Sequence, residues 1–295
     1  MADLILSGPI SAPASRWRSA LARGGARLWI GGVLVALLLL IALFAPVIAP
    51  HDPAEQDLMS AQLPPAFMRG GEAAFPLGTD ILGRDIAAGL VHGARISLIV
   101  GFSATALAVT VGTTVGLLSG YLGGWVDHVL MRVTELFQVI PHFLLAIILV
   151  AILGARIEFI VLAIGLTSWS MVARLVRAET LALRELDYVR ICVAMGGGPV
   201  RVMLTHILPN VLPPIIVAAS ILTALAVLTE AGLAFFGLSD SNHISWGGMI
   251  GASRDALLTA PYMTLIPGLA IVVTVMALSL IGDGLTALLR RGDGA

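Results

Sequence analysis

Long apolar runs without any charged residue constrain the fold of this chain more than any other feature. The first extends from Leu28 to Pro50. Five more cover residues 96–126, 136–155, 159–173, 202–229 and 256–282. Crossing a hydrocarbon core of roughly 30 Å takes about 20 apolar residues. In lipid each such run must satisfy its own backbone hydrogen bonds, so it has to be helical.

The sequence therefore predicts an all-α, polytopic membrane protein with six transmembrane helices. They are expected at about 29–49, 96–119, 136–154, 157–176, 211–238 and 262–286. The run at 159–173 is short, and it reaches a full span if Arg156, Glu158 and Arg174 lie at the interfaces with their side chains directed outward. Pro141 and His142 indicate a kink in the third span.

Composition excludes several other classes. Only 12% of the residues are charged, against about 25% in a soluble domain. The net charge of −1 argues against a nucleic-acid partner. A single cysteine, Cys192, excludes an internal disulfide and argues against a cysteine-based metal site. The first apolar run is longer than the roughly 7–15 residues typical of a signal peptide, which indicates a retained transmembrane helix.

The arginines indicate the orientation. They are concentrated in the N-terminal tail 1–28, in the loop 177–201 and after the last span, in the tail 287–295. With six spans these segments share one side, and the positive-inside rule makes that side cytoplasmic. The loop 50–95 is mainly acidic and is predicted to be external. The remaining core, 96–286, then includes a cytoplasmic loop at 177–210.

That loop contains an unusual stretch, RELDYVRICVAMGGGPVRVMLTHILPN, at residues 184–210. Leu186, Val189 and Val193 recur at helical spacing, which predicts an amphipathic helix over 184–196. Three glycines and Pro199 end it. A second short helix is expected over 200–208, ending at Pro209, with Asn210 capping the fifth span.

Two interpretations fit this amphipathic helix. It either lies flat on the membrane surface or docks onto another protein. Its polar face mixes Glu185 and Asp187 with arginines, whereas a helix that binds anionic lipid is mainly basic. The mixed charge favours docking.

The same segment resembles the cytoplasmic signature loop of ABC-importer permeases of the dipeptide, oligopeptide and nickel family, of the C-type subunit. The residues that carry the resemblance are Tyr188-Val189, Gly196 and His206-Ile207-Leu208-Pro209-Asn210. Other agreeing stretches are FPLGTDILGRD (75–85), GARISLIVG (93–101), GYLGGWVDHVLMRV (120–133) and much of 232–285. One departure is Arg190-Ile191-Cys192, which stands where the family usually has Glu-Ala-Ala.

The resemblance implies a type I ABC importer permease fold and a transport subunit that is not an enzyme. It implies a second permease subunit, two ATPase subunits and an external solute-binding protein as partners, in a bacterial inner membrane with both termini cytoplasmic. ATP and Mg²⁺ would be bound by the ATPase, and this chain would bind no cofactor or metal. No Walker A pattern is present. The residues implied to couple to the ATPase are Arg184, Glu185, Asp187, Tyr188, Arg190 and Gly196.

Peptides are the cargo that the resemblance favours, with nickel chelates, glutathione or another small solute as alternatives. Glu230 is either a pathway acid or a structural one. The loop 50–95 either docks the binding protein or sister subunit, or caps the outer mouth. The stretch 245–258 is predicted to form a short external amphipathic helix, with Trp246 as a membrane-interface anchor.

Two alternatives come from other classes of protein. They are an ATP-independent secondary transporter and an intramembrane protease that uses Ser119 and His142.

Overall fold

The computed structural model describes residues 14–49 and 52–292. In this part of the chain the regular elements are helices, and one isolated β-bridge joins Thr79 to Asp85. The α-helices are α1 (Ala14–Leu43), α2 (Ala45–Ile48), α3 (Ile86–Leu122), α4 (Gly124–Val139), α5 (His142–Leu153), α6 (Ile157–Arg184), α7 (Asp187–Ala194), α8 (Pro199–Val202), α9 (Leu208–Phe235), α10 (Trp246–Ser253) and α11 (Tyr262–Gly292). The predicted tails 1–28 and 287–295 are described only in part, since residues 1–13 and 293–295 lie outside the described residues.

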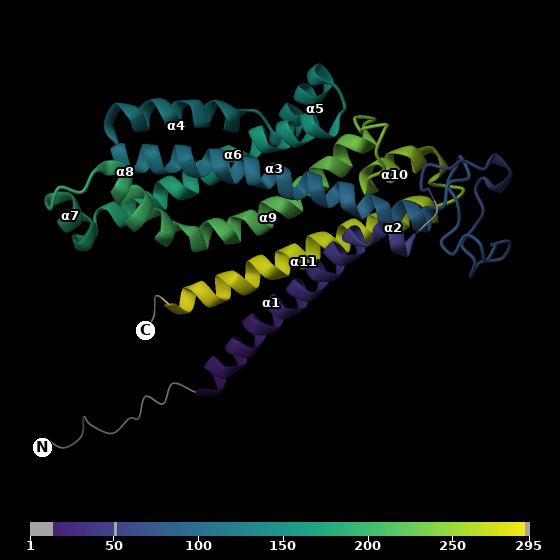
Figure 1. Cartoon of the computed structure of the whole chain (residues 1–295), viewed down its shortest axis with the longest axis horizontal. Helices are drawn as coiled ribbons and strands as arrows, with labels where there is room; N and C mark the ends of the chain where they lie inside the picture. The colour runs from purple at the N-terminus through teal and green to yellow at the C-terminus, as the bar shows by residue number, and fades with distance from the viewer. Residues whose placement is uncertain (1–13, 50–51, 293–295) are drawn as a thin grey trace, which may run out of the picture.

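The described residues contain five to six candidate spans, in agreement with the six that were predicted. Five segments are long and apolar enough to cross a membrane: the Gly25–Leu43 part of α1, α3, α6, the continuous helical stretch Pro199–Phe235, and α11. The bent pair α4–α5 makes a sixth when it is counted as one span. Figure 1 shows α3, α6 and α9 running side by side, with α1 and α11 paired along one side of them.

Close packing of α3 against α6 forms the centre of the bundle. A Cβ atom at Gly116 would lie 2.6 Å from the carbonyl oxygen of Ala173, and one at Gly112 would lie 2.6 Å from that of Trp169. Backbone atoms cannot move aside, so the helices approach this closely only because these positions are glycine. Buried Val172 and Val176 of α6 fill the same contact.

The third span differs from the single helix expected over 136–154. The helix begins earlier, at Gly124, and breaks at Ile140–Pro141, where α4 and α5 make an angle of 87°. Ile140 is extended, with ψ 129°, because the ring of the following proline disfavours helical geometry there. The predicted kink is thus confirmed, and it divides the span into two helices.

Helix α6 is longer than the expected 157–176, and it continues to Arg184. Arg174 therefore lies within the helix and contacts α4 through Gln138, 2.7 Å away, instead of ending the span at an interface. The expected helix over 184–196 is correspondingly shorter, and it is α7, Asp187–Ala194.

The expected break at Pro209 is wrong. Residues 199–235 form one continuous helical stretch, with a π-helical turn at Met203–Ile207. A π-helical turn shifts the hydrogen-bond register of the helix, which accommodates the missing N–H of Pro209. Asn210 does not cap a helix start, since its Nδ2 donates to the carbonyl oxygen of His206 at 2.6 Å.

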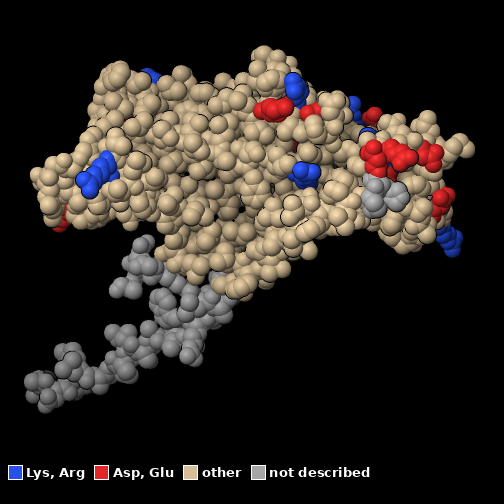
Figure 2. All heavy atoms as spheres, in the orientation of Figure 1, with Lys and Arg blue, Asp and Glu red and all other residues tan. Residues whose placement is uncertain are grey.

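The external end is built from a folded loop. Helix α3 begins at Ile86, ten residues earlier than the predicted 96, and the Asp85 side chain accepts from the N–H of Ala87 at 2.8 Å. The Tyr262 hydroxyl of α11 donates to the carbonyl oxygen of Leu63, which fixes this loop to the bundle. Figure 2 shows acidic side chains gathered on the end of the molecule formed by this loop, whose described residues start at 52.

A short helix is present in the predicted external stretch 245–258, as α10. The interpretation of Trp246 as an interface anchor is wrong. Its side chain is buried, and its Nε1 donates to the carbonyl oxygen of Leu90 on α3 at 2.8 Å. Burial of the indole inside the protein holds α10 against α3.

Candidate functional site

The residues predicted to contact an ATPase lie at the end of the bundle opposite the acidic loop. There α7 stands between the ends of α6 and α9 (Figure 1). Val189 is the buried residue of α7, with 1% exposure. Leu186 and Val193, expected on the same apolar face, are exposed instead. One side chain thus attaches α7 to the bundle, and most of the helix faces outward.

A groove runs beside α7 and has a volume of about 470 Å³. Its lining comes from the end of α3, the end of α6 and α7, namely Tyr121, Leu122, Arg184, Glu185, Val189, Arg190 and Val193. Three of the six predicted coupling residues, Arg184, Glu185 and Arg190, therefore share one groove. Tyr121 and Leu122 were not predicted, because nothing in the sequence places the end of α3 beside this loop.

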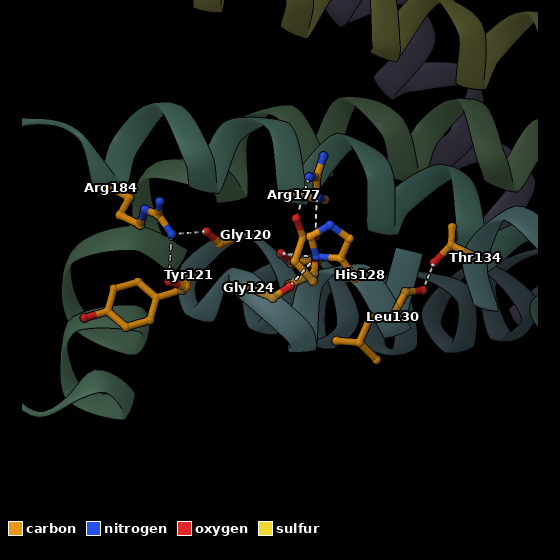
Figure 3. A network of polar contacts seen from close by, with 11 residues as sticks. Gly120, Tyr121, Gly124, His128, Leu130, Thr134, Arg177 and Arg184 are labelled. Atoms are coloured by element: carbon orange, nitrogen blue, oxygen red, sulfur yellow. Dashed lines mark hydrogen bonds and ion pairs between the residues drawn. The ribbon is translucent and has the colours of Figure 1, made fainter. Parts of the chain in front are cut away.

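Arg184 holds the groove together. Its Nη1 donates to the carbonyl oxygens of Gly120 and Tyr121, at 3.2 and 3.1 Å (Figure 3). The last carbonyls of a helix lack partners within it, so this guanidinium satisfies the end of α3. Arg184 is therefore fixed in the fold and is not free to reach far outward.

Glu185 and Arg190 form an ion pair across the turn between α6 and α7. Glu185 also lies 3.5 Å from Arg184. The hydrogen bond from Arg190 and the positive charge of its guanidinium hold the pKa of Glu185 below its ordinary value. Both side chains are more than half exposed, so the pair is accessible to a partner protein.

The other predicted coupling residues lie outside the groove lining. Asp187 begins α7 and is exposed. Tyr188 is also exposed, and its ring packs edge-on against His206 with 6.4 Å between the ring centroids. Gly196 has a φ of +89°, a conformation that glycine adopts at no steric cost, and it ends the segment after α7.

A polar connection between α4 and α6 was not predicted. Asp127 of α4 receives two hydrogen bonds from Arg177 of α6, at 2.5 and 2.6 Å (Figure 3). The sequence gives no signal for this pair, since the two residues are far apart in the chain. Arg132 and Glu135, three residues apart on α4, form a second ion pair at 3.1 Å.

Glu230 is buried in α9, with 4% exposure. The Ser245 hydroxyl donates to its Oε1 at 2.6 Å, and this hydroxyl also accepts from the N–H of Gly248 in α10. Within the described part of the chain, Glu230 has no ion pair with an arginine. Its contacts join α9 to the start of α10.

In the described part of the chain, no group of three or more His, Cys, Asp or Glu residues is placed to hold a metal ion. The two residues considered for a protease do not contact each other. Ser119 donates to the carbonyl oxygen of Gly116, while His142 bonds that of Thr167.

Comparison with protein families decides the class. Residues 112–292 match the family described as "Binding-protein-dependent transport system inner membrane component". The chain belongs to this family. Residues 27–65 also match the N-terminal transmembrane domain of oligopeptide transport permease C. The chain is thus a multi-pass inner membrane permease of an ABC importer, a transport subunit without a catalytic role. Membership implies an ATPase and a solute-binding protein as partners.

Relatives come from peptide and glutathione transport. The permease is 39% identical over 271 residues to the di/tripeptide transport system permease protein DppC of Pseudomonas aeruginosa, covering 91% of this chain and 88% of that one. It is 38% identical to the glutathione transport system permease protein GsiD of Pectobacterium atrosepticum, covering 86% and 83%.

A solved structure shares the fold. It is an inward-facing form of the MetNI methionine ABC transporter, with a TM-score of 0.51 and 19% identity, covering 66% of this chain and 93% of that one. The predicted ABC importer permease fold is in agreement with both comparisons.

Proposed function

We propose that this permease forms half of the translocation pathway for di- or oligopeptides, together with a second permease subunit. In this proposal the segment 184–198 couples it to a separate ATPase, and both termini are cytoplasmic. The relative from Pseudomonas aeruginosa, named for di/tripeptide transport, supports peptides as the cargo. Glutathione is itself a peptide, and the relative named for its transport makes it the second candidate.

One observation carries the coupling part of the proposal. At the tip around α7 and α8, large apolar side chains are exposed, some beyond the end of α6 and others at the start of the stretch Pro199–Phe235. They are Leu186, Ile191, Val193, Met195, Val200 and Leu204. An exposed apolar patch rimmed by charged residues is typical of a protein interface. Here the rim includes Glu185 and Arg190, and Val189 transmits any displacement of α7 to the ends of α6 and α9 through its buried contacts.

The test uses the complex purified from native membranes and reconstituted in vesicles. The wild-type complex is expected to accumulate a tripeptide only when ATP and the binding protein are supplied. Met195→Asp places a charge on the 83% exposed tip residue and is expected to lower ATP-driven uptake at least tenfold, with less ATPase recovered on purification.

Met59→Asp is the matched control, because Met59 is 94% exposed at the opposite end of the molecule. It should co-purify with the ATPase as the wild type does. Equal ATPase recovery in both variants would contradict coupling through this segment. Uptake of glutathione in preference to tripeptides would replace the proposed cargo with the second candidate.

A further inference from the structure

A polar cavity of about 520 Å³ lies between α4 and α6. Its α4 side is lined by Met131, Thr134, Glu135 and Gln138, spaced as one helical face. Its α6 side is lined by Arg174, Arg177 and Ala178, also on one face. The opposite face of α4 exposes apolar side chains, among them Val133 and Leu136. Helix α4 is thus amphipathic, and its polar face is directed at α6.

This cavity lies near the end of the membrane span that is closer to α7. The exposed pair Arg156–Glu158 marks one boundary of the span at the start of α6. Arg174 lies about 26 Å further along the helix, at 1.5 Å per residue, and the hydrocarbon core is roughly 30 Å thick. Lipid tails cannot satisfy a guanidinium, so a charged group this close to the boundary faces protein, water or the lipid headgroups.

Two contacts mark the ends of the cavity. At one end Arg177 binds Asp127, and at the other Nη1 of Arg174 donates to Oε1 of Gln138 at 2.7 Å. Met131, Thr134 and Glu135 lie between Asp127 and Gln138 along α4. The Gln138 contact therefore holds the guanidinium of Arg174 over the cavity, away from the lipid-facing side of α4.

The charges in and around the cavity leave one cation uncompensated. Arg177 is paired with Asp127, and Glu135 is paired with Arg132. Within the described residues no carboxylate lies within ion-pair distance of Arg174, whose hydrogen bond goes to the neutral amide of Gln138. A guanidinium has five N–H groups arranged to match a carboxylate, so Arg174 keeps donors available for an anion.

From these contacts we infer that the α4–α6 cavity is an anion-binding site in the half of the pathway nearest α7, and that Arg174 binds a carboxylate of the solute there. Gln138 positions the guanidinium. This inference rests on the proposed function, because a peptide with a free C-terminus supplies such a carboxylate as it passes. The site would hold the C-terminal end of the peptide until the pathway closes to the outside and opens to the inside.

The first test measures the cavity without any cargo. In a Cys192→Ser background, Ala178→Cys places a thiol in the cavity of the assembled complex. It is expected to react with charged thiosulfonate reagents and to favour the anionic reagent over the cationic one. Arg174→Gln should lower the rate of the anionic reagent by roughly fivefold, the factor that a unit charge about 4 Å away gives in water, and raise the rate of the cationic reagent by a similar factor.

Val133→Cys is the control, since Val133 lies on the exposed apolar face of α4. It should react with neither reagent. An Ala178→Cys thiol as unreactive as this control would overturn the inference. So would an anion preference that survives Arg174→Gln.

The second test compares uptake of trialanine with uptake of trialanine amide, which lacks the terminal carboxylate. Each variant's uptake is divided by the wild-type uptake of the same peptide, so the preference of the binding protein cancels. Arg174→Gln should lower this ratio about tenfold for trialanine and leave it near one for the amide, whereas Arg174→Lys should restore part of the loss. Equal loss for both peptides would overturn the carboxylate assignment.

A loss that disappears in vesicles without anionic lipid would overturn it as well, and would assign Arg174 to a lipid phosphate. A failure of the proposed function would give a different result from a failure of this inference. The wild-type complex would then take up neither peptide with ATP, while the thiol measurement would still report whether the cavity attracts anions.

Discussion

Arg177 of α6 and Asp127 of α4 form a two-point ion pair, with Nε 2.5 Å from Oδ1 and Nη2 2.6 Å from Oδ2. The pair is important because α4 has few buried contacts, among them the edge-on packing of Phe137 against Trp169 of α6, with 5.3 Å between the ring centroids. The one fully buried side chain of α4 is that of Thr134. The position of α4 along α6 therefore depends in part on polar contacts, and these same contacts shape the cavity that we assign to anions.

Asp127→Asn is expected to lower the free energy of unfolding by roughly 1–3 kcal/mol, because it leaves the guanidinium of Arg177 without its counter-charge in a partly buried site. The melting temperature of the purified protein measures the effect. Exchanging the two residues, Asp127→Arg with Arg177→Asp, should restore part of the loss.

Arg132→Gln is the matched control on the same helix, since the Arg132–Glu135 pair is exposed. An exposed pair contributes about 0–1 kcal/mol, so this variant should melt close to the wild type. Equal losses in the two variants would show that the Asp127–Arg177 pair has no special role.

Gly31 and Gly32 of α1 are adjacent residues with opposite surroundings. A Cβ at Gly31 would lie 2.6 Å from the carbonyl oxygen of Ala277 in α11, whereas one at Gly32 would have no atom within 4 Å. Gly31→Ala should therefore push α1 from α11 and destabilise the protein by roughly 1–3 kcal/mol, while Gly32→Ala should be neutral or slightly stabilising. Thermal unfolding of both variants checks this, and equal stability would contradict the α1–α11 packing.

Asp240, in the loop between α9 and α10, accepts from the first N–H of α6, that of Ile157, at 3.1 Å. Burial raises its pKa, but hydrogen bonds from Asn242, Ile157 and His243 outweigh burial and hold the pKa below the ordinary value. A carboxylate at a helix start contributes roughly 1 kcal/mol, so Asp240→Asn should be less stable than the wild type at pH 7.

The pH dependence follows from the lowered pKa of Asp240. The stabilisation is complete above the unfolded value, about 3.9, and is lost as the pH falls through the lower folded value. The difference in melting temperature between the wild type and Asp240→Asn should therefore be constant from pH 7 to about pH 5 and shrink below about pH 4. A difference that shrinks already between pH 7 and pH 6 would rule out this carboxylate as its source.

Ser245 serves two partners at once. It donates to Glu230 of α9 and caps α10 by accepting from the N–H of Gly248. Ser245→Ala removes a partner of the buried Glu230 carboxylate and of the half-buried N–H of Gly248, and should cost roughly 2–4 kcal/mol. Ser241→Ala, in the exposed loop nearby, should cost almost nothing. The melting temperatures of the two variants measure this difference. Nearly equal values would mean that the Ser245–Glu230 contact does not stabilise the protein.

Much of the fold could be predicted from the sequence. Charge-free runs determine where helices cross the membrane, because lipid accepts no unsatisfied backbone groups whatever the neighbouring helices are. Pro141 determines a break, since its ring disfavours helical geometry at Ile140. Val189 was correctly expected to face inward. The same expectation was wrong for Leu186 and Val193, because α7 is short and has a single buried position.

What the sequence by itself determined is therefore the local part: the spans, the break at Pro141, the turn at Gly196 and the class of protein to which the motifs belong. Only the tertiary structure decided the rest. Asp127 meets Arg177, and Gln138 meets Arg174, because α4 packs back along α6; Glu230 meets Ser245 because α10 packs against α9. Lipid contact depends on each segment alone, whereas a polar contact between distant residues depends on how the helices pack, which no local pattern encodes.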